Sequence, residues 1–308
     1  MNPAFSVIFF TVMSGLGYGI WALLGWRLLL GYETSRAIAL VALGVGGVLV
    51  TVGLLSSLLH LGQPQRAWRA FSQWGTSWLS REGVCAVLSF VPALALAWCL
   101  WSDTDHDALR WLGAALIIAA AATTYCTAMI YASLKPVPAW RNHLVPINYL
   151  VLAGYTGGLA FAALRALGGA VIDNDVAVMG MLVAVNVLFL KRMYWREVDL
   201  PLPLPRAAAL GLPHDRTAHV FERPHTEANY LLKEMGYVLA RRHSTRLRGI
   251  ALVLLAVAPW LLLLPVWQSA SVDPAPWLVA AAISALLGAF VERWLFFAEA
   301  RHLVTLYY

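Results

Sequence analysis

The chain has 308 residues, of which 60% are hydrophobic and only 12% are charged, and its mean hydropathy is +0.69. Soluble domains carry about 25% charged residues, so this composition excludes a soluble globular protein and indicates a polytopic membrane protein. The sequence pI near 9.4 then reflects charge distributed around the membrane and not nucleic-acid binding.

Apolar runs of about 20 residues, the length that crosses a bilayer as a helix, occur eight times. The first run is long enough to span and lacks the basic start and cleavage site of a signal peptide, so we expect a retained helix. The sequence therefore predicts an all-α, polytopic membrane protein, a single membrane-anchor domain over 1–308. Its eight transmembrane helices are expected near 5–30, 36–61, 83–102, 109–134, 144–168, 175–194, 249–267 and 276–299.

Lys and Arg are divided unequally between the two sides that eight crossings define. The side with both termini and the 2–3, 4–5 and 6–7 connections carries 18 of them, and the other side carries four. Without the long 6–7 connection and the adjoining Lys191 and Arg192, the count is still seven against four. Because positive residues stay cytoplasmic, we expect a multi-pass protein of the inner (cytoplasmic) membrane with both termini in the cytoplasm.

The connection from Ser56 to Glu82, SSLLHLGQPQRAWRAFSQWGTSWLSRE, gathers polar groups between two apolar runs. Such groups are costly in lipid, but at the mouth of a helical bundle they form a polar pocket with an apolar floor. That pocket suits an amphiphile with a polar head and a long apolar tail, such as a quinone. An aromatic belt at the interface explains the tryptophans alone, but not three arginines and a glutamate.

His60 is the central candidate in this pocket. It shares one helical face with Ser56 and Ser57, which lie four and three residues earlier. Imidazole can hydrogen-bond a quinone carbonyl and transfer a proton near neutral pH. The predicted quinone-binding residues of this connection are His60, Ser56, Ser57, Arg66, Trp78, Arg81 and Glu82.

A second connection, KPVPAWRNHLVPINY, has similar chemistry before span 5. If spans 2, 3 and 5 adjoin, its Arg141 and His143 meet the groups around His60 and join the quinone site. A capped helix start at the interface explains the same residues equally well. Within the spans, Glu292 and Arg293 are ionisable residues that either carry protons toward the pocket or form a paired charge near the interface.

Metal sites have no support in the sequence. Cys85, Cys99 and Cys126 all lie in apolar runs without a CxxC pair, which argues against iron–sulfur ligation, structural zinc and c-type haem attachment. None of the eight histidines lies in the middle of a predicted span, so we expect no haem deep in the bundle. A haem b near the cytoplasmic surface, on His60 with His143 or His302, stays an alternative.

The 6–7 connection, 195–248, is longer than any other. It opens with PLPLP, typical of extended polyproline II structure, and from Thr226 reads as a helix that ends in a basic cluster. One interpretation is an interfacial helix on anionic lipid. The other, which we favour because the proline-rich half has no lipid-binding logic, is a cytoplasmic docking connection for a partner.

The motifs HLGQPQRAWRAF and SWLSRE resemble the dimethyl sulfoxide reductase anchor-subunit family. KPVPAWRNHLVPINY and HTEANYLLKEMGYVLARRHS are more similar to its branch in sulfite dehydrogenase (quinone) complexes. The resemblance implies a membrane anchor without its own redox metal, binding ubiquinone or menaquinone with His60 at the quinone site. Its partners would be a ferredoxin-like iron–sulfur subunit docked on the cytoplasmic face and, through it, a molybdopterin catalytic subunit.

The sequence thus predicts an oxidoreductase subunit that passes electrons between the iron–sulfur subunit and the quinone pool, with sulfite oxidation implied by the resemblance. The alternatives are an anchor of a dimethyl sulfoxide or polysulfide reductase, which oxidises quinol, and a haem b-carrying cytochrome subunit. A secondary transporter would need broken helices and mid-membrane ionisable residues, whereas the charges here gather at one mouth.

Overall fold

The computed structural model describes residues 4–58, 63–102, 106–200, 206–213, 215–219, 221–222, 243–269 and 271–306. Among these described residues, eight helices are long and apolar enough to cross a membrane, which confirms the all-α, eight-span prediction. Seven of these spans are single helices: α1 (Phe5–Leu29), α2 (Arg36–Leu58), α3 (Trp78–Trp101), α4 (His106–Ala132), α5 (Leu144–Leu167), α6 (Asn174–Val198) and α12 (Pro274–Ala298).

The remaining span, the seventh, is built from three segments. They are α10 (Ser244–Leu252), a π-helical turn η2 (Val253–Val257) and α11 (Ala258–Gln268). The hydroxyl of Ser284 on α12 donates a hydrogen bond of 2.9 Å to the carbonyl of Leu254 in the π turn. Pro259, two residues after the turn, lacks an N–H, so α12 supplies a donor where the helical ladder is irregular.

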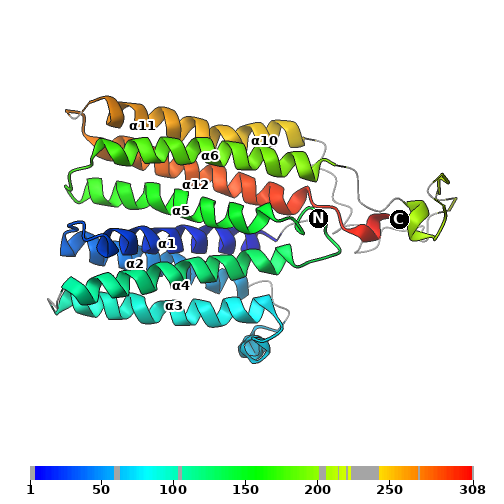
Figure 1. The fold of residues 1–308 in the computed structure, drawn as a ribbon, viewed down its shortest axis with the longest axis horizontal. Coiled ribbons are helices and arrows are strands. Elements are labelled where there is room, and N and C mark those ends of the chain that lie inside the picture. The colour runs from blue at the N-terminus through cyan, green and yellow to red at the C-terminus, as the bar shows by residue number, and fades with distance from the viewer. Residues whose placement is uncertain are drawn as a thin grey trace.

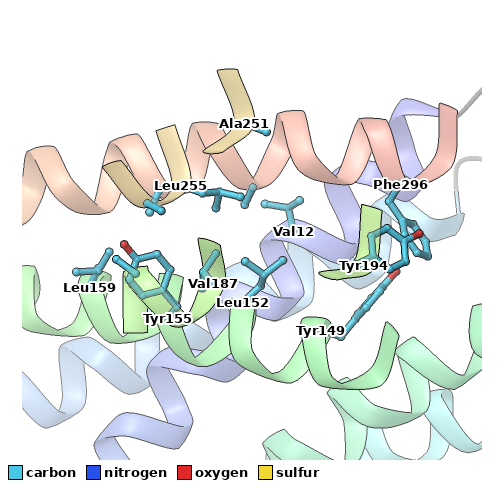
Figure 2. Close-up of a cluster of buried hydrophobic side chains, with 14 of the residues drawn as sticks. Val12, Tyr149, Leu152, Tyr155, Leu159, Val187, Tyr194, Ala251, Leu255 and Phe296 are labelled. Atoms are coloured by element: carbon cyan, nitrogen blue, oxygen red, sulfur yellow. The ribbon is translucent and has the colours of Figure 1, made fainter. Parts of the chain in front are cut away.

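The helices form two groups that meet at α1 and α5 (Figure 1). On one side, α1 packs against α2 and α4, and α4 packs against α3. On the other side, α5 packs against α6 and α12, and the seventh span packs against α6 and α12. The buried apolar side chains form one cluster in each group, and Figure 2 shows part of the cluster on the α5 side.

Glycines allow α1 to approach α5 closely. An added Cβ at Gly19 of α1 would lie 1.9 Å from the carbonyl oxygen of Ala153, and one at Gly157 of α5 would lie 2.3 Å from the carbonyl carbon of Gly19. Backbone atoms therefore contact across this crossing. Without a hydrophobic driving force between helices in lipid, such close packing holds the two groups together.

Both ends of the described chain lie at the same end of the bundle, on the right in Figure 1. We call it the terminal face. It also carries the end of α2, the short 3-10 helix η1 (Pro64–Gln73), the start of α3 and the connection between α4 and α5. The last turn of the chain, η3 (Leu303–Leu306), is fixed to this face, because the amide of Leu303 donates to the carbonyl of Pro136 at 2.9 Å.

Arg248 joins the two roots of the long 6–7 connection. Its guanidinium donates to both carboxylate oxygens of Asp199, at 2.7 and 2.9 Å, and to Glu299 at 3.0 Å. Asp199 ends α6, where the connection leaves the bundle, and Arg248 lies on α10, where it returns. Burial raises the pKa of Glu299, and the Arg248 cation opposes that rise. The bidentate geometry holds the two roots together.

Candidate functional site

The turn between η1 and α3 is closed by Arg81. Its guanidinium donates to the carbonyls of Trp74 at 2.9 Å and Gly75 at 2.6 Å, and it lies 4.4 Å above the ring of Trp78. The Trp78 ring in turn packs edge-on against Tyr125 of α4. Arg81 therefore holds a positive charge and an aromatic ring in fixed positions at the terminal face.

Glu82 follows directly and points into the bundle. Glu82 is 5% exposed, and its carboxylate accepts a hydrogen bond of 2.5 Å from the hydroxyl of Thr127 on α4. Burying a carboxylate whose hydrogen-bond donor is a neutral hydroxyl costs free energy, and ionisable residues in such places usually have a functional role. Glu82 is adjacent in sequence to Arg81, so an ionisable group and a fixed cation both lie where η1 and the start of α3 reach the terminal face. We call this part of the face the mouth.

The predicted residues of α2 lie at the same face. Ser57 donates to the carbonyl of Leu54 in its own helix, and Ser56 donates to Gly53 and, at 3.2 Å, to Ser6 of α1. Ser56 therefore contributes to the contact between α2 and α1. His60, the central candidate of the sequence, lies outside the described residues, so its role stays a prediction.

Arg66 lies on η1 and is exposed. Its amide donates to the carbonyl of Gln63 at 3.0 Å, at the start of the short helix. Because η1 packs against the start of α3, Arg66 belongs to the same mouth as Arg81 and Glu82.

The second predicted group lies elsewhere on the terminal face. Nδ1 of His143 is 3.9 Å from the carboxylate of Glu197 on α6, and the amide of Asn142 donates to the same carboxylate at 2.7 Å. Helix α5 packs against α1, α6 and α12, whereas α3 packs against α4, η1 and α2. The structure therefore turns His143 toward α6. Arg141 is exposed beside it, and a quinone role for either residue stays a prediction.

Glu292 and Arg293 are buried in α12, and their partner across the bundle is Lys191 of α6. Nζ of Lys191 lies 2.5 Å from Oε1 of Glu292, and the two side chains are 2% and 1% exposed. Nη2 of Arg293 lies 3.8 Å from Oε2 of Glu292. Of the two interpretations that the sequence left open, the structure displays a paired charge, and it places this pair inside the bundle.

Arg293 also stacks on an aromatic cluster. Its guanidinium carbon lies 3.8 Å from the centre of the Tyr149 ring and 5.3 Å from that of Phe296. Figure 2 shows Tyr149, Tyr194 and Phe296 gathered at one end of the buried cluster. Cation–π contact offsets part of the cost of burying the guanidinium.

A small polar cavity separates this cluster from Glu82. Its volume is about 20 Å³, room for about one water molecule. Thr127, Tyr149 and Arg293 line it, together with hydroxyls from α1, α4 and α5. The hydroxyl of Tyr149 and Nε of Arg293 have no hydrogen-bond partner among the described residues. The cavity is too small for a quinone ring, so an amphiphile of that size has to bind nearer the mouth.

The described part of the chain contains no group of side chains that could bind a metal ion. There, no three His, Cys, Asp or Glu side chains lie close enough together to hold a metal ion. Two histidines named above as possible ligands of a surface haem differ in their surroundings. The side chain of His143 is 72% exposed, whereas burial lowers the pKa of His302.

Sequence reasoning missed two partners at the site. Thr127 was one hydroxyl among several in span 4, and only the packing of α3 against α4 makes it the partner of Glu82. Lys191 was not singled out within span 6. The signal that could have identified it is the presence of a cation, Lys191, and an anion, Glu292, in two different apolar runs.

Comparisons with known proteins point to one family of membrane anchors. The model of a family described as DMSO reductase anchor subunit (DmsC) matches residues 1–298. The C subunit of the sulfite dehydrogenase of Allochromatium vinosum is 32% identical, with 100% of this chain and 99% of the relative aligned. The C polypeptide of the anaerobic dimethyl sulfoxide reductase of Escherichia coli is 29% identical over 46% of this chain and 49% of the relative.

Proposed function

Because this chain belongs to the DMSO reductase anchor subunit (DmsC) family, we propose that it is the quinone-binding anchor of a molybdopterin oxidoreductase. In this proposal it passes electrons between a docked iron–sulfur subunit and the membrane quinone pool. Sulfite is the substrate we favour for the catalytic subunit, because the relative named for sulfite dehydrogenase aligns over the full length of both proteins. Ubiquinone and menaquinone both fit this role.

The buried carboxylate of Glu82 at the mouth carries the proposal. Quinone chemistry moves protons together with electrons, so the site needs a group that exchanges protons near the quinone head. Glu82 is such a group, held by Thr127 and placed one residue from the fixed cation of Arg81. Trp78 offers an aromatic face to the head. Ser57 lies at the end of the neighbouring helix α2, and His60 follows it three residues later in the sequence.

The roles of these residues follow from their chemistry. His60 hydrogen-bonds one quinone carbonyl, and Glu82 takes up or delivers a proton. Arg81 and Arg66 add positive charge that steadies a transiently anionic quinone. The iron–sulfur clusters and the molybdopterin belong to the partner subunits, and the anchor itself supplies no metal ligand to the reaction.

The terminal face is proposed to be cytoplasmic and to carry the iron–sulfur partner. Electron tunnelling weakens steeply with distance, so the quinone site and the docked clusters have to share one face. The 195–248 connection is proposed to be the docking element. Arg248 joins its two roots, so a short linker in place of 201–242 should leave the bundle folded and release the partner subunits from the membrane. Retention of the partners at normal yield would show that docking lies elsewhere.

His60→Ala and Glu82→Gln test the quinone site. In His60→Ala, loss of a hydrogen bond to a strongly polar group costs about 1.5–3 kcal/mol, roughly ten- to a hundredfold in rate. In Glu82→Gln, loss of a positioned proton-exchanging group costs roughly a hundredfold or more. Each variant of the purified complex should lose quinone-coupled turnover by about that factor or more. Turnover with a soluble artificial electron carrier should persist, because that route bypasses the anchor. Normal quinone turnover in both variants would contradict the proposed site, and equal loss in both assays would indicate failed assembly.

The second candidate is an anchor that oxidises quinol for a sulfoxide or polysulfide reductase. The partial match to the relative named for dimethyl sulfoxide reductase favours it. The purified complex separates the two: sulfite should reduce added quinone in the first case, whereas in the second quinol should be oxidised when dimethyl sulfoxide or polysulfide is supplied. An optical spectrum of the same sample, reduced minus oxidised, tests for haem b.

A further inference from the structure

An apolar groove runs along the bundle between α2 and α3. Its volume is about 460 Å³, and its lining is apolar apart from Thr51. Gly44, Gly47 and Val48 of α2 form one wall, Phe90 and Leu94 of α3 form the other, and Trp21 of α1 forms the floor.

The groove exists because two glycines of α2, Gly44 and Gly47, have no side chain to fill it. A Cβ added at Gly44 would meet no atom within 4 Å, and one at Gly47 would reach only the Trp21 ring at 3.6 Å. The indole of Trp21 is kept in place from both sides. Its N–H donates to the carbonyl of Leu43 at 3.1 Å, and its ring packs edge-on against Phe90 at 5.3 Å. Its polar atom is thus satisfied, and the ring, which is only 1% exposed, supports the apolar floor of the groove from beneath.

The groove lies further along the same two helices that carry polar groups at the terminal face. Thr51, the last polar position of its wall, precedes Ser56 by five residues, about 8 Å along α2. Phe90 follows Glu82 by eight residues, about 12 Å along α3. The same two helices therefore carry polar groups at the terminal face and an apolar channel below them.

We propose that this α2–α3 groove binds the isoprenoid tail of the quinone whose head lies at Glu82. The inference rests on the proposed function and extends it to the part of the substrate that carries no redox chemistry. A long-chain quinone is an amphiphile with the same order of parts, a polar ring followed by an apolar tail. In lipid the tail gains no hydrophobic free energy by entering the groove. What it gains is van der Waals contact with fixed walls, and that contact orients the head at the mouth.

Gly44→Leu tests the groove with little risk to the fold, because its side chain enters open space. Val48→Phe, one helical turn further along α2, is a second variant of the same wall. Gly154→Leu on α5 is the matched control, since a Cβ at Gly154 also meets no atom within 4 Å and lies outside the groove. The purified complexes are reconstituted in liposomes and assayed with a long-tail quinone, with a quinone lacking the isoprenoid tail, and with a soluble electron carrier.

The groove variants should raise the KM for the long-tail quinone by about threefold or more, a modest effect that matches packing in lipid. The KM for the tail-free quinone should change much less, and Gly154→Leu should alter neither. Equal changes for both quinones would overturn the tail assignment and point to altered packing of α2 on α3. No change for either would also overturn it and leave the groove to a lipid acyl tail. His60→Ala and Glu82→Gln, assayed in parallel, report on the head site alone, so failure of the groove is distinguishable from failure of the proposed function.

Discussion

Lys191, Glu292 and Arg293 form a buried group with two cations and one anion. The Lys191–Glu292 pair is almost inaccessible, and Arg293 lies 3.8 Å from the same carboxylate. Glu292 is therefore the shared counter-charge of both cations. Removing one partner of a buried ion pair is costly, because it leaves a charge without compensation.

This arrangement predicts an unequal pair of single substitutions. Glu292→Met leaves two buried cations and should destabilise the protein by about 3–5 kcal/mol, whereas Lys191→Met leaves Glu292 with Arg293 and should cost less. The double variant should be more stable than Glu292→Met alone. Thermal unfolding of the purified complex measures the order, and Arg192→Met, at the exposed neighbouring position, is the control. A Lys191 variant as unstable as the Glu292 variant would contradict the shared role.

At the level of single residues, chemistry was easier to predict than pairing. The sequence indicated that Glu82 matters, because it joins three arginines in a polar connection, and that Glu292 matters, because ionisable residues are rare within spans. It did not provide their partners: Thr127 and Lys191 lie 45 and 101 residues away, and only helix packing brings them close. The same limit applies to His143, which was grouped with His60 by residue type and lies beside Glu197 of α6.

Among the helices, α1 holds the two groups together. Its glycines contact three neighbours: Gly17 faces Gly46 of α2, Gly25 faces Gly113 of α4, and Gly19 faces Gly157 of α5. The crossing of α1 and α5 was not foreseen, because a lone glycine in an apolar run gives no sign of its partner.

Two glycines of α5 make this crossing testable. Gly157→Ala should force α1 and α5 apart and cost about 1–3 kcal/mol, as overpacking does where backbone atoms are already in contact. Gly154→Ala, three residues earlier, meets open space and should be neutral or slightly stabilising, since alanine favours helix. Thermal unfolding of the two variants gives the comparison. Similar midpoints would mean that the crossing yields more easily than its geometry indicates.

The span limits were predicted from hydropathy to within about five residues at most helix ends, as apolar length allows. Helix α3 begins at Trp78, five residues before the predicted start, because the polar residues Ser80, Arg81 and Glu82 belong to its first turns. The π turn in the seventh span was not predicted. Its register depends on the contact of Leu254 with Ser284, which local sequence does not encode.

For the molecule as a whole, charge asymmetry predicts one orientation in the membrane. Lys191 and Arg293 prove to be buried in helices, but the remaining Lys and Arg still favour the terminal face. Reporter proteins fused after Gly31 and Gly169 should indicate a location outside the cytoplasm. Those fused after Gly75 and at the C-terminus should indicate a location in the cytoplasm. The measurement is the activity of a compartment-dependent reporter in whole cells. A cytoplasmic response after Gly169 would reverse the orientation and place the mouth outside.

The contact between Arg248 and Asp199 has a consequence for how the protein can be produced. Because a side-chain bond joins the place where the chain leaves the bundle to the place where it returns, the peptide link between the sixth and seventh spans becomes dispensable. Two separate polypeptides, 1–220 and 221–308, should assemble into a functional anchor when expressed together, and copurification through a tag on one fragment would detect it. Asp199→Ala should weaken this reassembly while the uncut protein tolerates the change, because the cut protein lacks the covalent link and relies on this contact together with helix packing to recruit its last two helices. Reassembly that is unaffected by Asp199→Ala would assign recruitment to helix packing alone.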